Sequence, residues 1–284
     1  MGIFQELCKT ERGGLVQTVW MVNGAQERQM FSAADMLLDA RRTNKPIVDL
    51  PADLRPQTIE EAYVVQDRMS LAYEAIGGWK VGAPSADATP MFAPMPLAWI
   101  SGNGSELRGI TYRYRGLEAE IAFLMGEDLP ARKTPYTRDE VLGAIASCHP
   151  AIEVLESAFV DPAQASRLSM IADLQMHGGF VYGPACPDWQ RIDFSQEHVT
   201  LAVDGAVRVE RTGSNTSGDL LRLLPFLANE GAARTGGLKR GNWITTGSWT
   251  GNTQASAGSV VDVQFSTAGR VNLRFGWEGS GLPD

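Results

Sequence analysis

Apolar and polar residues alternate between residues 117 and 124. The odd-numbered positions are all apolar, whereas the even-numbered ones begin with Glu118 and Glu120 and continue with Ala122 and Leu124. Alternation with a period of two predicts a β-strand. Both carboxylates then share one face with two apolar residues, so neither face is plainly a solvent face.

Glu118 and Glu120 lie one strand step apart, and this spacing creates an electrostatic problem. Like charges on one face repel each other, and burying either carboxylate without a partner costs free energy. A hard cation such as Mg²⁺, Mn²⁺ or Ca²⁺ removes both penalties, because such ions prefer oxygen ligands. The alternative is a strand whose charged face meets water, and the glutamate pair alone does not exclude it.

The N-terminal part of the chain has helical patterning. Apolar positions at helical spacing predict a helix over 33–42, and residues before 30 form an extension without assigned structure. Thr58 and Glu61 form a capping box that predicts a second helix over 59–75. A strand over 79–82 and a long proline-rich loop over 83–96 follow, and a loop of that length is usually functional or disordered.

Short apolar segments separated by glycine turns dominate the chain from residue 97 onward. Two helices are predicted among them, over 138–148 and over 219–234, and Pro225 is expected to split or delay the second. The predicted strands cover residues 107–112, 117–125, 151–155, 179–182, 199–203, 206–210, 243–247, 260–265 and 271–275.

This order of elements predicts an α+β fold. We expect an N-terminal extension over 1–29, a helical region over 30–96 with a lysine-bearing strand and loop, and a β-rich domain over 97–284. The length of 284 residues is sufficient for a large core in one or two domains.

Composition excludes several classes of function. A net charge of −8 argues against non-specific nucleic-acid binding, which relies on basic patches. No apolar run approaches the length of about 18 residues that indicates a membrane span. The three cysteines, Cys8, Cys148 and Cys186, form no C-x-x-C pair. This usage is typical of a reducing cytoplasm, where we expect the protein to reside.

A third acid lies in an apolar setting at Glu153, within a short strand about 30 residues after Glu120. Carboxylates on adjacent strands are what a cation site requires, and three of them leave about three octahedral positions open. His149 lies just before this strand and His177 lies in the loop after Asp173, but a lone histidine is more often structural than catalytic. Glu156 is expected to be structural.

Seven short motifs of this chain occur in the same order in one known family. Over residues 30–280 the chain resembles the 2-keto-4-pentenoate hydratase and 4-oxalocrotonate decarboxylase group of the fumarylacetoacetate hydrolase superfamily. The motifs are Gly78-Trp79-Lys80-Val81-Gly82, Glu118-Ala119-Glu120, Pro150-Ala151-Ile152-Glu153-Val154, Ala172-Asp173, Phe226-Leu227-Ala228-Asn229-Glu230, Thr246-Gly247-Ser248-Trp249-Thr250-Gly251 and Gly258-Ser259-Val260-Val261.

The resemblance implies a rolled mixed β-sheet, a homo-oligomer and a divalent metal, Mg²⁺ or Mn²⁺. The implied metal ligands are Glu118, Glu120 and Glu153, the implied catalytic residues are Lys80 and Asp173, and the implied substrate-binding residues are Ser85, Ser248 and Thr250. We expect the metal and a partly dry pocket to lower the pKa of Lys80.

The implied activity is that of a metal-dependent lyase acting on a small 2-oxo or 2-hydroxydienoic acid. The leading hypothesis is hydration of a 2-hydroxypenta-2,4-dienoate-like substrate through a metal-stabilised enolate. The alternatives are a 4-oxalocrotonate-type decarboxylase, an acylpyruvate or β-diketone C–C hydrolase, and a paralogue without turnover. A hydrolase of this superfamily often uses a histidine ahead of the ligands, and no histidine precedes Glu118.

Three departures from the family pattern bear on substrate and reaction. The chain has Ala83-Pro84-Ser85 where the family commonly has Leu-Thr-Ser, and Ala158 where it often has arginine. It also has Leu174 after Asp173, where the family often has asparagine.

Overall fold

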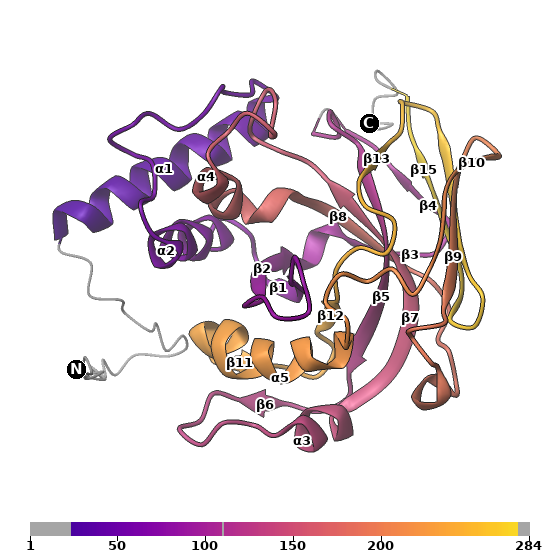
Figure 1. Cartoon of the computed structure of the whole chain (residues 1–284). Helices are drawn as coiled ribbons and strands as arrows, with labels where there is room; N and C mark the ends of the chain where they lie inside the picture. The colour runs from indigo at the N-terminus through magenta and orange to yellow at the C-terminus, as the bar shows by residue number, and fades with distance from the viewer. Residues whose placement is uncertain (1–23, 110, 278–284) are drawn as a thin grey trace.

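The computed structural model describes residues 24–109 and 111–277, in which helices lie beside two packed β-sheets (Figure 1). Helix α1 (Gly24–Thr43) buries Met30, Ala33, Ala34, Leu37 and Ala40, which lie on one helical face. The predicted extension over 1–29 falls mostly outside the described residues, and its last six residues belong to α1.

Helix α2 (Ile59–Ser70) packs against α1. Its predicted cap is confirmed, because the Thr58 side chain accepts a hydrogen bond from the Glu61 amide at 3.2 Å. The helix ends at Ser70, five residues earlier than predicted.

An eight-stranded mixed sheet forms the centre of the molecule. Strands β1 and β12 pair in parallel, as do β3 and β8, and the other pairs are antiparallel. The strand order is β2-β1-β12-β5-β7-β8-β3, with β13 also paired to β5. Its strands are β1 (Ile76–Gly82), β2 (Met91–Pro96), β3 (Ile100–Gly102), β5 (Gly116–Met125), β7 (Ile145–Leu155), β8 (His177–Tyr182), β12 (Trp243–Thr245) and β13 (Thr253–Gln254).

A five-stranded sheet packs against this sheet through contacts of β14 and β15 with β7 (Figure 1). Its order is β10-β9-β14-β15-β4, and a small ribbon of β6 and β11 lies apart from it. These strands are β4 (Ser105–Leu107), β6 (Leu129–Pro130), β9 (His198–Val203), β10 (Ala206–Thr212), β11 (Gly237–Leu238), β14 (Val260–Phe265) and β15 (Gly269–Phe275). The predicted α+β class is confirmed.

The helix predicted over 138–148 is half wrong. Helix α3 (Arg138–Gly143) ends early because β7 begins at Ile145, and Cys148 pairs with Phe123 of β5. A short apolar run fits a helix or a buried strand equally well, and here pairing with β5 decides the outcome.

The helix predicted over 219–234 is broken into short turns. Helix α5 (Leu223–Phe226) lies between a 3₁₀ turn at Leu220–Arg222 and a π turn at Leu227–Gly231. Pro225 cannot donate a backbone hydrogen bond, which agrees with the predicted interruption. Elsewhere, the short helix α4 (Arg167–Ala172) packs against α2.

Two further predictions need correction. The second half of the predicted proline-rich loop is the edge strand β2, where prolines are tolerated because one side of an edge strand needs no ladder hydrogen bonds. The strand predicted over 107–112 is wrong for the residues that the structure describes, because β4 ends at Leu107 and Gly109 just beyond it adopts a φ of +123°.

Strands β1 and β2 precede residue 97, yet they belong to the same sheet as β5 and β7. The chain on both sides of the predicted domain boundary therefore builds one sheet. Among the described residues, no helix has the length and apolar character needed to cross a membrane.

Candidate active site

Strand alternation and strand register bring three carboxylates together. Glu118 and Glu120 point to the same face of β5, because successive side chains of a strand point to opposite faces. Glu153 of β7 lies directly across from Glu118 in the antiparallel ladder. One oxygen of each carboxylate lies within 4.8 Å of the others, so the three could hold a single cation.

Glu120 is buried and held by a turn that follows β12. The Thr245 hydroxyl and the Gly247 amide both donate hydrogen bonds to its Oε2 atom, the latter at 3.0 Å. These donors fix the carboxylate on the sheet face.

Glu153 is fully buried, and its two oxygens differ in their surroundings. Its Oε1 atom lies 2.7 Å from Lys80 Nζ and 2.9 Å from His177 Nδ1. Its Oε2 atom is buried and has no hydrogen-bond partner. A buried carboxylate oxygen without a partner is costly, and a cation among the three glutamates would satisfy it.

The three carboxyl groups are unlike in acidity. Burial, followed by the charge of Glu153, raises the pKa of Glu118 to about 7 and raises that of Glu120 well above its ordinary value. Burial also raises the pKa of Glu153, but Lys80 and His177 outweigh it and bring the pKa to about 2. Glu118 and Glu120 therefore hold protons more tightly than ordinary glutamates, and a bound cation would compete with those protons.

Without a bound cation, the three glutamates dominate the surroundings of Lys80 and raise its pKa. Burial lowers its pKa, but the charges of Glu153, Glu118 and Glu120 outweigh burial and raise it. Its Nζ atom also donates to the backbone carbonyl of Gln175 at 3.0 Å. The lysine is therefore held as an ammonium group beside the acid cluster.

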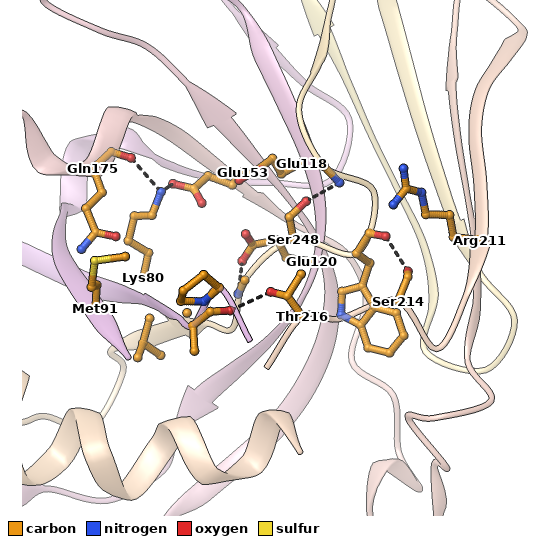
Figure 2. Close-up of a pocket in the computed structure, with 17 residues that line it drawn as sticks. Lys80, Met91, Glu118, Glu120, Glu153, Gln175, Arg211, Ser214, Thr216 and Ser248 are labelled. Atoms are coloured by element: carbon orange, nitrogen blue, oxygen red, sulfur yellow. Dashed lines mark hydrogen bonds and ion pairs between the residues drawn. The ribbon is translucent and has the colours of Figure 1, made fainter. Parts of the chain in front are cut away.

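These groups line a cavity of about 390 Å³ (Figure 2). Its wall includes two of the other predicted site residues, Lys80 and Ser248. Ser248 hydrogen-bonds Glu118 and accepts a hydrogen bond from the Gly251 amide at 2.9 Å. The remaining lining residues are Val81, Gly82, Ala83, Pro84, Met91, Gln175, Arg211, Ser214, Thr216, Gly247, Trp249 and Gly251.

Asp173, Ser85 and Thr250 are not part of the cavity wall. Asp173 is fully buried and pairs with Arg41 at 2.6 Å. The Thr250 hydroxyl accepts a hydrogen bond from the Ala119 amide at 3.0 Å and so fastens the turn to β5. The structure therefore does not bring these three predicted residues to the acid cluster.

Gln175 lines the cavity and was not predicted from the sequence. It lies in a segment of three successive non-glycine residues with positive φ, which are Leu174 (50°), Gln175 (49°) and Met176 (64°). Such a conformation costs of order 1–3 kcal/mol per residue and is typically found at functional sites. No residue pattern signals it, because none of the three is glycine or asparagine.

Arg41 of α1 holds this strained segment in place. Besides the Asp173 carboxylate, its guanidinium binds the carbonyl oxygens of His177 at 2.8 Å and Glu156 at 3.1 Å. The N-terminal helix thereby supports the turn whose Gln175 carbonyl accepts from Lys80.

Comparisons with known proteins agree with this architecture. The sequence model of the fumarylacetoacetate (FAA) hydrolase C-terminal family matches residues 72–275. A 2-keto-4-pentenoate hydratase from Paraburkholderia xenovorans (strain LB400) is 24% identical over 260 residues, which cover 87% of this chain and 95% of the relative. A 4-oxalocrotonate decarboxylase from Pseudomonas putida is 22% identical over 258 residues, which cover 87% and 97%.

A solved structure shows the same fold. The 4-oxalocrotonate decarboxylase from Pseudomonas putida G7, complexed with magnesium and adipate, superposes with a TM-score of 0.76 at 23% identity. The match covers 87% of this chain and 97% of the other. The resemblance inferred from the ordered motifs is thus confirmed, and the chain is an enzyme that belongs to the fumarylacetoacetate hydrolase family.

Proposed function

We propose that this enzyme is a divalent-cation-dependent lyase and that it hydrates a 2-hydroxypenta-2,4-dienoate-like acid. The observation that carries the proposal is the grouping of three carboxylates within 4.8 Å, at a cavity wall, with Glu153 Oε2 buried and unpaired. The names of the hydratase and decarboxylase relatives support the substrate class.

The residues present fit a divalent cation, Mg²⁺ or Mn²⁺. Glu118, Glu120 and Glu153 would hold it through carboxylate oxygens, which leaves about three octahedral positions for water and substrate. When bound, the cation supplies a Lewis acid for the carboxylate and 2-oxygen of the substrate.

Lys80 is the residue to which we assign proton transfer. Its side chain is 13% exposed, so the ammonium group borders the cavity without being freely solvated. The Glu153 carboxylate and the Gln175 carbonyl each accept a hydrogen bond from its Nζ atom and thereby direct the remaining N–H bond. Hydration of a dienol requires a proton on carbon before water adds, and a positioned ammonium group can deliver it.

Ser248 is assigned to substrate binding, because its hydroxyl lies in the cavity wall beside Glu118. Asp173 and Thr250 receive positioning roles instead. Asp173 pairs with Arg41 behind the strained segment, and Thr250 fastens the turn that carries Ser248. Ser85 is given no role at the reacting atoms, because it lies outside the wall.

Decarboxylation of a 4-oxalocrotonate-like acid is the second candidate. Loss of CO₂ from such an acid yields an enolate at the 2-oxygen, and the proposed hydration passes through the same kind of enolate. The acid cluster could therefore serve either reaction. Assembly into a homo-oligomer and residence in the cytoplasm remain predictions.

Substrate turnover tests the reaction type. Protein loaded with Mg²⁺ is incubated with 2-hydroxypenta-2,4-dienoate and, separately, with 4-oxalocrotonate, while the dienol absorbance and released CO₂ are followed. We expect loss of the dienol without CO₂ from the first substrate. Release of CO₂ from the second substrate alone would replace hydration by decarboxylation. Turnover of neither substrate would contradict the proposed lyase.

A further inference from the structure

Lys80 has two hydrogen-bond acceptors, and both depend on one short stretch of backbone. Its Nζ atom donates to Glu153 Oε1 and to the carbonyl oxygen of Gln175 (Figure 2). Glu153 Oε1 is also bonded to His177, which follows Gln175 by two residues. The direction of the ammonium group therefore depends on how residues 175–177 are held.

This stretch does not keep its conformation through local preference. Leu174, Gln175 and Met176 all have positive φ angles, which are uncommon for residues other than glycine. Such a conformation persists only where surrounding contacts fix the backbone. One contact comes from the Gln175 side chain, whose Nε2 atom donates to the Phe92 carbonyl oxygen at 2.6 Å. Further contacts lie at the two ends of the stretch.

Arg41 bonds both ends of the stretch at once. Its guanidinium donates to the carbonyl oxygen of Asp173, just before the three residues, at 3.0 Å. It also donates to the carbonyl oxygen of His177, just after them, at 2.8 Å. The Nε atom adds a bond to the Asp173 carboxylate at 2.6 Å. Because a guanidinium holds its N–H groups in a rigid plane, these bonds fix the two ends relative to each other.

Arg41 lies behind the cavity and not in its wall. Its guanidinium packs over the ring of Trp99, 5.8 Å from the ring centroid, and its side chain is 9% exposed. It belongs to α1, which precedes the residues 72–275 that the family model matches. A residue in this place can influence a bound substrate only through the groups that it holds.

We propose that Arg41 is a positioning residue for Lys80. By fixing Asp173 to His177, it sets the direction of the Gln175 carbonyl and thereby aims the ammonium group of Lys80 into the cavity. The inference rests on the proposed function, in which Lys80 delivers a proton to the substrate. It makes helix α1 a part of the active site, although α1 contributes no residue to the cavity wall.

The test replaces Arg41 with lysine in Mg²⁺-loaded protein and measures turnover of the substrate that the wild type accepts. Lysine keeps a positive charge beside Asp173, but one ammonium group cannot reproduce the planar arrangement that spans both carbonyl oxygens. We expect Arg41→Lys to lower kcat roughly tenfold to a hundredfold, as misplacement of a reacting group does. KM and Mg²⁺ affinity should stay within a few-fold of wild type, because the three glutamates and the cavity wall are unchanged.

The matched control is Arg234→Lys. Arg234 is similarly buried, with 5% of its side chain exposed, and it pairs with Asp67 of α2 outside the cavity wall. This variant should lower the melting temperature and retain wild-type kcat. A wild-type kcat in Arg41→Lys, or equal losses of kcat in both variants, would overturn the positioning role. Wild-type protein without turnover of either substrate would instead overturn the proposed function, and this inference with it.

A second measurement asks whether Arg41 acts through Lys80. Lys80→Gln alone should lower kcat by about 10²- to 10⁴-fold, the range for loss of a positioned proton donor. Adding Arg41→Lys to that variant should lower kcat no further, because the group that Arg41 positions is already gone. A second fall of the same size in the double variant would overturn the inference, as would wild-type kcat in Lys80→Gln.

Discussion

The sheet face that carries the three glutamates has a second half, and the two halves are built in opposite ways. Beyond Glu120, the same face of β5 continues with Ala122 and Leu124, which lie across from His149 and Trp243. This second half, here termed the aromatic half, consists of His149, Phe180, Tyr182 and Trp243 around Met95, Ala122 and Ala151. The acidic half consists of Lys80, Glu118, Glu120 and Glu153.

Each half contains or contacts one buried histidine, and the two histidines show the difference. Both ring nitrogens of His149 are bonded, one to the Ser147 hydroxyl at 2.7 Å and the other to the Gly183 carbonyl at 2.8 Å. His177 bonds Glu153 through Nδ1, whereas its Nε2 atom is buried without a partner. In the aromatic half, the protein itself supplies a hydrogen-bond partner for both ring nitrogens of the histidine. In the acidic half, one ring nitrogen is left without a partner.

The comparison shows that this fold can fill the sheet face with packed rings and paired polar groups. Tyr182 stacks on Trp243 at 4.1 Å between ring centroids, and nothing in that half calls for a ligand. Where the same face instead retains like charges and one buried oxygen without a partner, local stability has been given up, which is typical of a functional site.

Loss of a carboxylate from the acidic half should have the largest effect. Glu120→Gln removes a charged ligand of the proposed cation, so kcat/KM should fall by roughly a thousandfold or more. In chelator, the same variant should melt at a higher temperature than the wild type at pH 8, because burial and the charges of Glu153 and Glu118 disfavour the ionised form. Wild-type turnover in this variant would remove Glu120 from the site.

Substitutions in the aromatic half should change the free energy of unfolding and leave the affinity for the cation unchanged. Trp243→Ala removes the ring at the centre of that cluster and should lower the free energy of unfolding by about 3–5 kcal/mol. Mg²⁺ affinity of the folded protein, measured by calorimetry at low temperature, should stay within a few-fold of wild type. Trp243→Phe serves as the milder control. A large loss of Mg²⁺ affinity in either variant would mean that the two halves are not independent.

The two buried histidines give a matched pair. His177→Leu removes the hydrogen bond that orients Glu153, and should weaken Mg²⁺ binding about 10- to 100-fold. His149→Leu makes the same chemical change in the aromatic half and should leave Mg²⁺ affinity nearly unchanged while lowering the melting temperature. Equal losses of affinity in both variants would contradict the distinction between the halves.

The smallest expected effect is on the pH dependence of cation binding. Because the pKa of Glu118 is raised to about 7 without a cation, a proton must leave when the cation binds at lower pH. Mg²⁺ affinity should therefore fall about tenfold per pH unit below pH 7 for each proton displaced. Calorimetry in buffers of different ionisation enthalpy measures the proton release. A flat affinity between pH 5.5 and pH 8 in protein that stays folded would contradict these carboxyl pKa values.

Some of this site could be predicted from residue patterns and some could not. Alternation along 117–124 correctly placed Glu118 and Glu120 on one strand face. The register that sets Glu153 opposite Glu118 is a long-range pairing that no local pattern contains. The apolar setting of Glu153 indicated a candidate third ligand, and the family resemblance implied that it joins the other two.

The features that the sequence analysis missed have causes that residue patterns do not display. Gln175 reaches the cavity because three successive residues adopt positive φ angles, a backbone conformation that tertiary contacts stabilise, chiefly those of Arg41. Arg211 lies on a strand that is exposed almost throughout, so alternation does not single it out. Residues 145–148 were predicted as helix because a short apolar run does not reveal its period.

The most direct test of the cation site is a calorimetric titration of metal-free protein with Mg²⁺, repeated with Glu153→Gln. We expect about one Mg²⁺ per wild-type chain, because three carboxylates converge on one point. We expect no measurable binding in the variant under the same conditions. Equal binding by both proteins, or the absence of binding to folded wild type by either Mg²⁺ or Mn²⁺, would contradict the cation site.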